Sequence, residues 1–221
     1  MALELYWGSG SPFVWRVMLT LEAKQLPYES KQLEFSKAEH KSAEYLALNP
    51  RGKVPTLRDG DFTLYESVAI MAYLERKVPQ PPLFGNTPVE AGLIWRFVAE
   101  CEYLIAAGDK IIRPLFFGKG LENVEQIQAG AEGIRNELQR LDAALSEGDW
   151  LVGDRMTAAD IAVFPLVQLC LRAAGKDAAR SFDLRIAPLK KFYSNVAQWV
   201  QRIEALPYYQ NTYPPHWRTS S

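Results

Sequence analysis

The segment that decides the fold of this chain runs from residue 49 to residue 67. It reads Asn49-Pro50-Arg51-Gly52-Lys53-Val54-Pro55-Thr56-Leu57-Arg58-Asp59-Gly60-Asp61-Phe62-Thr63-Leu64-Tyr65-Glu66-Ser67. Asp59-Gly60 lies between two apolar runs and predicts a β-hairpin, because a type I′ turn requires positive φ at both central residues. Ser67 precedes a helical pattern that begins at Val68, so we expect Ser67 to be the N-cap of a helix.

Val54-Pro55 is the unusual feature of this segment. Proline donates nothing to a strand ladder, so within a sheet it is confined to an edge or to the start of a strand. A trans bond that opens an edge strand is one reading, and a cis bond that turns the Val54 backbone N–H and C=O outward is the other. In the second reading an extended peptide pairs with Val54 as an added strand. The helix start at Ser67 attracts that peptide's carboxylate, so the segment predicts a site for a short acidic peptide.

Composition limits the classes of function. The 221 residues are 48% hydrophobic with a net charge of −1, which gives no reason to expect a nucleic acid or an anionic membrane as a partner. Cys101 and Cys170 are far apart and form no C-x-x-C motif, so we expect two buried free thiols and no metal site. The N-terminus has no signal-peptide pattern, and no apolar stretch approaches the ~18 residues of a membrane span. We expect a cytoplasmic protein.

The first part of the chain predicts an α/β unit. Leu3, Leu5 and Trp7 alternate as in a strand, a helical pattern follows to about Lys24, and residues 28–33 read as a second strand. A strand–helix–strand unit of this length predicts a right-handed parallel crossover. After a polar stretch over 36–48, the hairpin and the helix over 68–77 complete the order of a thioredoxin-like fold.

A proline-rich stretch over 79–88 separates this unit from a helical one. Beyond it the helical patterns cover 89–117, 122–147, 158–174 and 187–205, so the second domain is predicted to be a helical bundle. Thr157 and Asp160 have capping-box spacing before an apolar helix that we expect to be buried. The predicted domains are residues 1–78 and 89–221, joined by the linker 79–88.

These motifs resemble the cytosolic glutathione transferases over nearly the whole chain. Val-Pro, a hairpin and Glu-Ser at a helix start are similar to the glutathione-binding half of that family, and Thr157 with Asp160 is typical of its C-terminal domain. The resemblance implies a cis Val54-Pro55 bond, with Val54 pairing with the cysteinyl backbone of glutathione. It also implies that Glu66 and Ser67 hold the γ-glutamyl end.

Ser11-Pro12 reads as an N-cap followed by a proline at the first helical position, which needs no catalytic purpose. The functional reading adds that the Ser11 hydroxyl remains free to donate to a thiolate. A donated hydrogen bond at the positive end of a helix dipole lowers a thiol pKa. A shift of ~2 units from about 8.5, equivalent to about 2.7 kcal/mol, makes the thiolate the major species at neutral pH.

The resemblance divides between classes. Ser11 ahead of Arg16-Val17 is similar to the serine-type classes, and Trp15-Arg16-Val17 looks like the zeta class. Glu39-His40-Lys41-Ser42 followed by the segment over 46–57 looks more like the phi class. That likeness implies that His40 and Lys41 contact the glycyl carboxylate, helped by Lys53 where phi enzymes usually have glutamine. A solvated helix face is the alternative for His40 and Lys41.

Two other hydroxyls rival Ser11 as the thiolate donor. Ser9 lies between two glycines, and Tyr6 lies on the first strand, where the tyrosine-type classes keep their donor. The omega-like classes, which carry out thiol–disulfide exchange, have a cysteine where this chain has Ser11.

The resemblance implies a glutathione transferase that adds glutathione to small apolar electrophiles. Candidate residues for the electrophile pocket are Trp7, Pro12, Phe35, Phe116 and Phe117, closed over by the aromatic tail over 208–217, although ordinary core packing is the better explanation for each of them. The alternatives are a non-catalytic glutathione-binding scaffold and a glutathione-dependent isomerase of the zeta type. Family members form homodimers that pair the first domain of one subunit with the helical domain of the other. The sequence does not specify the natural electrophile.

Overall fold

The computed structural model describes residues 2–218, which form two compact units. Residues 2–84 group with residues 206–218, and residues 85–205 form the second unit. The tail therefore belongs with the first unit, whereas the boundaries drawn from the sequence placed it with the helical domain. Each unit is described by itself.

The first unit is built on a four-stranded mixed sheet with the order β2-β1-β3-β4. The strands are β1 (Leu3–Trp7), β2 (Tyr28–Gln32), β3 (Thr56–Asp59) and β4 (Phe62–Tyr65). β1 and β2 pair in parallel through the crossover helix α1 (Pro12–Ala23), while β3 pairs antiparallel with both β1 and β4. The predicted thioredoxin-like order is confirmed.

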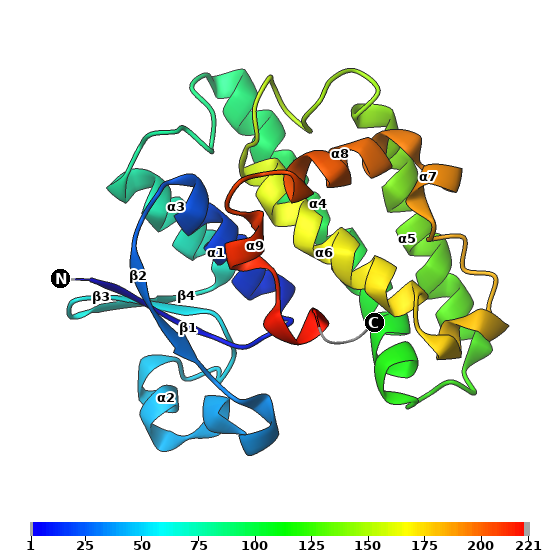
Figure 1. Cartoon of the computed structure of the whole chain (residues 1–221), viewed down its shortest axis with the longest axis horizontal. Coiled ribbons are helices and arrows are strands. Elements are labelled where there is room, and N and C mark those ends of the chain that lie inside the picture. Colours follow the sequence, from blue (N-terminus) through cyan, green and yellow to red (C-terminus); the bar gives the residue numbers. More distant parts are fainter. Residues whose placement is uncertain (1, 219–221) are drawn as a thin grey trace. The chain divides into compact units, whose positions relative to one another are not determined.

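The side chains of β1 alternate between the two faces of this sheet. Leu3, Leu5 and Trp7 join a core with α1 and with α3 (Ser67–Lys77). Tyr6 points to the other face, where its ring lies 6.0 Å from that of Tyr45 on α2 (Ala43–Leu48). Figure 1 shows α1 and α3 above the sheet and α2 below it. Two 3-10 turns, Phe35–Lys37 and Glu39–Lys41, lead from β2 into α2.

The hairpin and the following helix start differ by one residue from their predicted positions. Asp59 pairs with Phe62, so the central residues of the loop are Gly60 and Asp61 rather than Asp59 and Gly60. Gly60 has φ +62°, and Asp61 is not among the residues with positive φ. Ser67 is the first residue of α3, because Glu66, at φ +72°, takes the N-cap position.

A buried ion pair holds the start of the proline-rich segment on the first unit. The Lys24 ammonium, fully buried, lies 2.7 Å from the Glu75 carboxylate and donates to the backbone carbonyls of Val78 and Pro81. Glu75 also accepts from the N–H of Leu83. These contacts explain why the chain as far as residue 84 packs with the sheet rather than behaving as a free linker.

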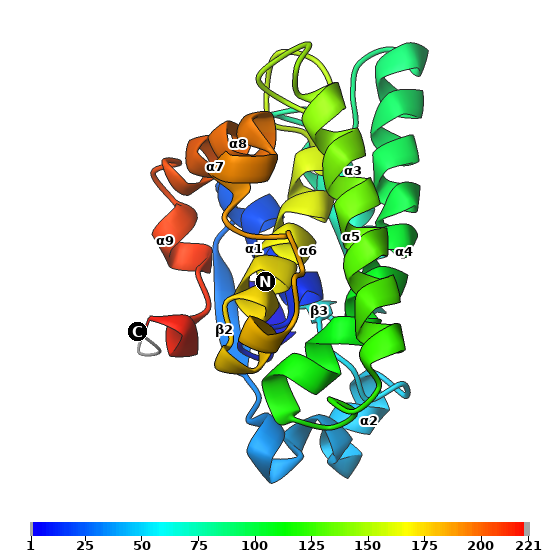
Figure 2. The same ribbon diagram turned by 90° about the vertical axis from the view of Figure 1, so that its right-hand side faces the viewer.

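The second unit consists of helices. They are α4 (Pro88–Phe117), α5 (Val124–Ala144), α6 (Ala158–Ala174), α7 (Leu189–Phe192) and α8 (Ser194–Glu204), with a 3-10 turn at Asp177–Ser181. The single pattern expected over 187–205 is divided at Tyr193 into α7 and α8. Figure 2 shows α4 and α5 running side by side along one face of this unit. The helical bundle is confirmed. Within residues 2–218, no helix is both long enough and apolar enough to span a membrane.

The capping box at the start of α6 is confirmed and is larger than the sequence indicated. Thr157 and Asp160 exchange the predicted side-chain to backbone hydrogen bonds. Asp160, fully buried, also accepts from the Leu151 N–H at 3.0 Å and from the Trp199 indole N–H at 2.9 Å. Burial raises the pKa of the Asp160 carboxyl, and the hydrogen bonds from Leu151 and Thr157 offset part of that rise. The carboxylate thus joins α6 to α8 and to the preceding loop.

Candidate active site

Five of the predicted peptide-binding residues line one cavity of about 160 Å³ in the first unit. They are Lys53, Val54, Pro55, Glu66 and Ser67. Phe13, Asn49 and Arg51 complete its wall. The cavity therefore brings together the start of β3, the start of α3 and the first turn of α1.

The loop before Val54 is braced from behind by two polar side chains. The buried Asn49 donates to the Lys53 carbonyl at 2.7 Å and to the Thr56 hydroxyl at 3.1 Å. The Tyr45 hydroxyl donates to the same Lys53 carbonyl at 2.6 Å and pairs with Thr56. Asparagine in an Asn-Pro turn commonly bonds its own backbone two residues on, and here the Asn49 carboxamide oxygen accepts from the Arg51 N–H. The loop is thus held in one conformation.

The Val54-Pro55 peptide bond is cis, which confirms that reading of the sequence. Among residues 2–218, no hydrogen bond reaches the Val54 N–H or C=O, although the Lys53 carbonyl immediately before them is satisfied twice. Val54 is half-buried at the cavity wall. One donor and one acceptor, spaced as in an unpaired strand, are therefore available to a ligand backbone.

The start of α3 supplies a second group of polar atoms. The first intrahelical bond runs from the Ile70 N–H to the Glu66 carbonyl, so the amides of Ser67, Val68 and Ala69 have no backbone partner in the described chain. Glu66, a non-glycine residue at φ +72° and ψ 114°, is in a strained backbone conformation of the kind that clusters at binding sites. The Ser67 side chain, 6% exposed, lines the cavity. This end of the cavity is suited to a carboxylate.

The cavity wall carries two cations and one carboxylate. Arg51 and Lys53 extend from the loop, and the Arg51 guanidinium lies 3.7 Å from the Glu66 carboxylate. Both partners are about two-thirds exposed, so this pair contributes little to stability and is easily rearranged by a ligand. The cavity wall therefore offers charges of both signs to a ligand.

His40 and Lys41 lie outside the cavity wall. Lys41 donates from its ammonium group to the Gly52 carbonyl at 2.8 Å, so it supports the loop that carries Lys53. The His40 ring packs edge-on against Phe35 at 5.1 Å, and its Nδ1 is buried without a hydrogen-bond partner in the part of the chain that is described. Their predicted contact with a ligand carboxylate remains a prediction.

The three candidate thiolate donors differ in their hydrogen bonds. The Tyr6 hydroxyl donates to the Glu4 carboxylate at 3.1 Å, and burial together with that carboxylate raises the Tyr6 pKa. The Ser9 hydroxyl pairs with His216 Nδ1 at 2.6 Å. Ser11 is the N-cap of α1, as predicted, and its oxygen accepts from the Val14 N–H at 3.4 Å.

The Ser11 O–H, by contrast, has no acceptor among residues 2–218. Ser11 is not itself a lining residue of the cavity, but Phe13 on the same helical turn is. Of the three hydroxyls, those of Tyr6 and Ser9 are each hydrogen-bonded to another side chain, whereas the Ser11 hydroxyl lies at a helix N-terminus with no side-chain partner among the described residues.

The residues expected to bind an apolar electrophile do not form one described pocket. Trp7 belongs to the sheet core, and its indole N–H donates to Ser30. Phe35 packs over Gly8, and Pro12 is the first residue of α1. Phe116 and Phe117 are the last residues of α4 in the second unit, where Phe117 is 71% exposed.

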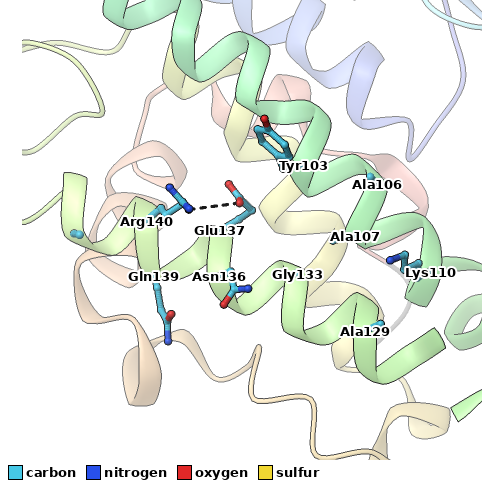
Figure 3. A pocket seen from close by; sticks show the side chains of 11 residues that line it. Tyr103, Ala106, Ala107, Lys110, Ala129, Gly133, Asn136, Glu137, Gln139 and Arg140 are labelled. Atoms are coloured by element: carbon cyan, nitrogen blue, oxygen red, sulfur yellow. Dashed lines mark ion pairs between the residues drawn. The ribbon is translucent and has the colours of Figure 1, made fainter. Parts of the chain in front are cut away.

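A separate groove of about 620 Å³ lies on the helical unit and contains none of the predicted site residues. Figure 3 shows Tyr103 and Lys110 of α4 facing it, with Glu137 and Arg140 of α5 forming an ion pair at its side. Cys101 and Cys170 are buried free thiols, and burial raises the Cys170 pKa to about 12. In the described residues, no three His, Cys, Asp or Glu side chains are arranged to hold a metal ion.

Sequence reasoning missed the supporting residues of the cavity. Asn49, Tyr45 and Arg51 were not predicted to take part, although the Asn-Pro-Arg-Gly turn is a signal for a side chain that bonds its own loop. Phe13 carried no such signal. The role of Glu75 in holding the proline-rich segment was also not foreseen, because that segment read as a linker.

Family models match both parts of the chain. The model described as the glutathione S-transferase N-terminal domain matches residues 1–76, and the one described as the glutathione S-transferase C-terminal domain matches residues 107–207. Among curated relatives, "Glutathione S-transferase A" of Pleuronectes platessa is 29% identical, with 99% of this chain and 94% of the relative covered. "Glutathione S-transferase 2" of Schizosaccharomyces pombe is 32% identical, with 95% and 94% covered.

Solved structures give the same result. A glutathione S-transferase from the Antarctic clam Laternula elliptica matches with a TM-score of 0.86 and 33% identity, covering 100% of this chain and 96% of the other. A glutathione transferase homolog from Drosophila mojavensis, solved with bound glutathione, matches with a TM-score of 0.79 and 29% identity, covering 96% and 91%.

Proposed function

The chain belongs to the glutathione S-transferase family and is a glutathione transferase. We propose that it is of the serine type, in which the Ser11 hydroxyl stabilises the glutathione thiolate. The observation that carries this proposal is the Ser11 hydroxyl at the N-terminus of α1, which has no side-chain partner among residues 2–218, whereas the hydroxyls of Tyr6 and Ser9 are each hydrogen-bonded to another side chain. A donor at the N-terminus of α1 adds to the positive helix dipole, and both lower a thiol pKa.

Glutathione occupies the cavity at residues 49–67 in this proposal. Its cysteinyl backbone pairs with the N–H and C=O of Val54, which have no other partner within residues 2–218. Its γ-glutamyl carboxylate takes the amides at the start of α3 and the Ser67 hydroxyl, while Glu66 accepts from the ammonium group. Lys53 supplies charge for the glycyl carboxylate, and Lys41 supports Lys53 through the Gly52 carbonyl. His40, which lies outside the cavity wall, is assigned a further contact with that carboxylate on the family resemblance alone.

The chemistry then follows from the thiolate. Its sulfur attacks the electrophilic carbon of the second substrate, forming a C–S bond, and the electron pair leaves with the displaced group or moves onto the acceptor. The thiol proton has already passed to solvent, so the enzyme only has to keep the thiolate populated and oriented. We assign the second substrate to small apolar electrophiles and the protein to the cytoplasm, as is typical of the family.

We further propose that the chain works as a homodimer, and that the groove between α4 and α5 contributes to the interface. Val89, Leu93 and Tyr103 on α4 are exposed apolar side chains, at 74%, 42% and 64%. The groove carries both signs of charge, with Lys110 and Arg140 beside Glu137, so two copies related by a two-fold axis present complementary surfaces. Light scattering at micromolar concentration is expected to give twice the chain mass, and a monomer mass contradicts the proposal. Tyr103→Asp is expected to lower the mass towards the monomer, and Val124→Asp, at an exposed residue outside the groove, serves as its control.

Turnover of a chloro-dinitroaromatic substrate with glutathione tests the proposed function. We expect the wild-type protein to conjugate glutathione at neutral pH. In Ser11→Ala the rate should fall about tenfold or more, because the pKa of the bound glutathione thiol is expected to rise by one to two units. Thr87→Ala removes a comparable N-cap from α4, where the Thr87 hydroxyl accepts from the Glu90 N–H at 3.1 Å, and is expected to keep its rate. An equal loss in both variants, or none in Ser11→Ala, contradicts the serine mechanism.

A further inference from the structure

The loop over residues 8–11 has little room to move. A Cβ placed on Gly8 would lie 2.2 Å from Cζ of Phe35, and one on Gly10, at φ +85°, would lie 2.7 Å from Cε1 of His216. Aromatic rings therefore pack directly on the loop backbone at both glycines. Ser11 is the residue that follows this packed loop.

The Ser11 carbonyl accepts from the Trp15 N–H at 3.1 Å, but the N–H and the hydroxyl of Ser11 make only long hydrogen bonds. Its N–H reaches the Gly8 carbonyl at 3.4 Å, and its Oγ accepts from the Val14 N–H at 3.4 Å. Both distances are beyond the usual range for hydrogen bonds to a backbone N–H. The direction of the Ser11 hydroxyl therefore depends on what fixes the backbone before it.

His216 makes the short polar contact to that loop. Its Nδ1 lies 2.6 Å from the Ser9 Oγ, although the two residues are 207 positions apart in the sequence. His216 belongs to the 3-10 turn Pro215–Trp217, in the tail that groups with the first unit. A residue from the end of the chain thus bonds to the loop two residues before the proposed thiolate donor.

The tail is firmly anchored on α1. The Trp15 indole N–H donates to the Thr212 hydroxyl at 2.9 Å, and both side chains are buried. The Trp15 ring also meets Tyr213 and Trp217 edge-on, at 5.8 Å and 5.5 Å. Figure 1 shows the last helix, α9 (Tyr209–Thr212), beside α1. His216 is therefore attached to the same helix that Ser11 caps, through a rigid aromatic cluster.

We propose that His216 is a positioning residue for the reaction, which fixes the loop over residues 8–11 through Ser9 and so directs the Ser11 hydroxyl at the glutathione sulfur. The proposal rests on the proposed role of Ser11. It assigns the tail a part in setting the thiolate population, beyond covering α1. A misplacement of about 1 Å in a catalytic group is enough to cost a large factor in rate.

The test compares four single variants and the double variant His216→Leu with Ser9→Ala. Each is measured by the ultraviolet absorbance of the bound glutathione thiolate against pH, together with kcat and KM for glutathione. His216→Leu fills a similar volume but cannot bond to Ser9, and Ser9→Ala removes the same bond without changing the ring. His216→Asn can place a polar atom where Nδ1 lies and is the conservative variant. Thr212→Val loses a tail hydrogen bond to Trp15 and leaves His216 and Ser9 intact.

In His216→Leu and Ser9→Ala we expect the thiol pKa to rise by about half to one unit and kcat at neutral pH to fall about three- to tenfold. KM for glutathione should change less than twofold, since the peptide is held at residues 49–67. The double variant is expected to match the single ones, His216→Asn to recover most of the loss, and Thr212→Val to lower the melting temperature without moving the thiol pKa.

Two results overturn the inference. One is a wild-type thiol pKa in His216→Leu, and the other is a thiol pKa that moves in Thr212→Val as much as in His216→Leu, because loosening of the tail would then explain both. Ser11→Ala, measured in parallel, distinguishes failure of this inference from failure of the proposed role of Ser11. If it shifts the thiol pKa and His216→Leu does not, the inference alone fails; if it shifts nothing, the proposed function fails with it.

Discussion

The Asp160 cluster in the helical unit and the Val54–Ser67 edge in the first unit are both polar groups set among apolar ones. Asp160 receives hydrogen bonds from Leu151, Thr157 and Trp199, and its carboxylate oxygens are both used. At the Val54 edge, a donor, an acceptor and the first amides of α3 have no partner within residues 2–218. The polar groups of the Asp160 cluster are hydrogen-bonded within the protein, whereas those at the Val54 edge need a ligand or water as their partner.

This contrast separates a structural motif from a binding motif. Leaving a partly buried amide unpaired costs free energy, so a fold keeps such groups only where a ligand or water completes them. The braced side of the same loop shows that the chain can satisfy these groups, since the Lys53 carbonyl receives two hydrogen bonds. We therefore take the open groups at Val54 as part of the proposed site, and changes in the two regions are expected to affect different measurements.

The largest effect is expected on stability, in the Asp160 cluster. Asp160→Ala leaves the buried N–H groups of Leu151, Thr157 and Trp199 without their acceptor, and we expect it to cost about 3–5 kcal/mol in the free energy of unfolding. Chemical denaturation followed by circular dichroism measures the loss, and Asp160→Asn, which keeps one acceptor oxygen, should fall between. In protein that remains folded, the thiol pKa of bound glutathione should be unchanged. A stability within 1 kcal/mol of wild type would contradict the structural role.

A smaller effect, on glutathione binding rather than on stability, is expected at the Val54–Ser67 edge. Ser67→Ala removes a hydroxyl that we place on the γ-glutamyl carboxylate, and a hydrogen bond to a charged group contributes about 1.5–3 kcal/mol. The dissociation constant for glutathione from calorimetry should rise about tenfold or more, with little change in melting temperature. Ser181→Ala removes an exposed hydroxyl that donates to the Ala178 carbonyl, and it should bind as wild type. Equal affinities in Ser67→Ala and wild type would exclude Ser67 from the site.

The fold was predictable from sequence because apolar periodicity and turn residues specify it locally. Leu3, Leu5 and Trp7 alternate into the core as expected, and the capping box at Thr157 was read correctly. The start of α3 was misplaced by one residue, because the positive φ at Glu66 is imposed by the surrounding structure and no propensity predicts it for glutamate.

The site was predictable only in part, for a similar reason. Lys53, Val54, Pro55, Glu66 and Ser67 lie close together in sequence around one hairpin, so a local motif located them. The contact between Ser9 and His216 joins the two ends of the chain, and no spacing rule indicates such a pair. The resemblance to a known family identified the ligand, which the physical pattern had limited only to a short acidic peptide.

The smallest effect is expected for the exposed charge at the cavity. Lys53→Ala should raise the dissociation constant for glutathione about two- to fivefold, because an exposed ion pair contributes up to about 1 kcal/mol. The effect should shrink at high salt, where the charge is screened. Lys41→Ala, which acts through the Gly52 carbonyl, should have a lesser effect with weaker salt dependence. Lys37→Ala, at an exposed lysine paired with Glu34, is the control. If the dissociation constant for glutathione changes neither in Lys53→Ala nor with salt, Lys53 is not part of the site.

The thiolate titration of the glutathione complex tests the central claim most directly. Ultraviolet absorbance against pH, for wild type beside Ser11→Ala, should show the thiol pKa higher by about one to two units in the variant, with activity partly recovered as pH rises. Glutathione affinity should change less than rate, because the proposal assigns Val54, Glu66 and Ser67 to holding the peptide. Tyr6→Phe should titrate as wild type, since the Tyr6 hydroxyl is bonded to Glu4. Superimposable curves for wild type and Ser11→Ala would contradict the account.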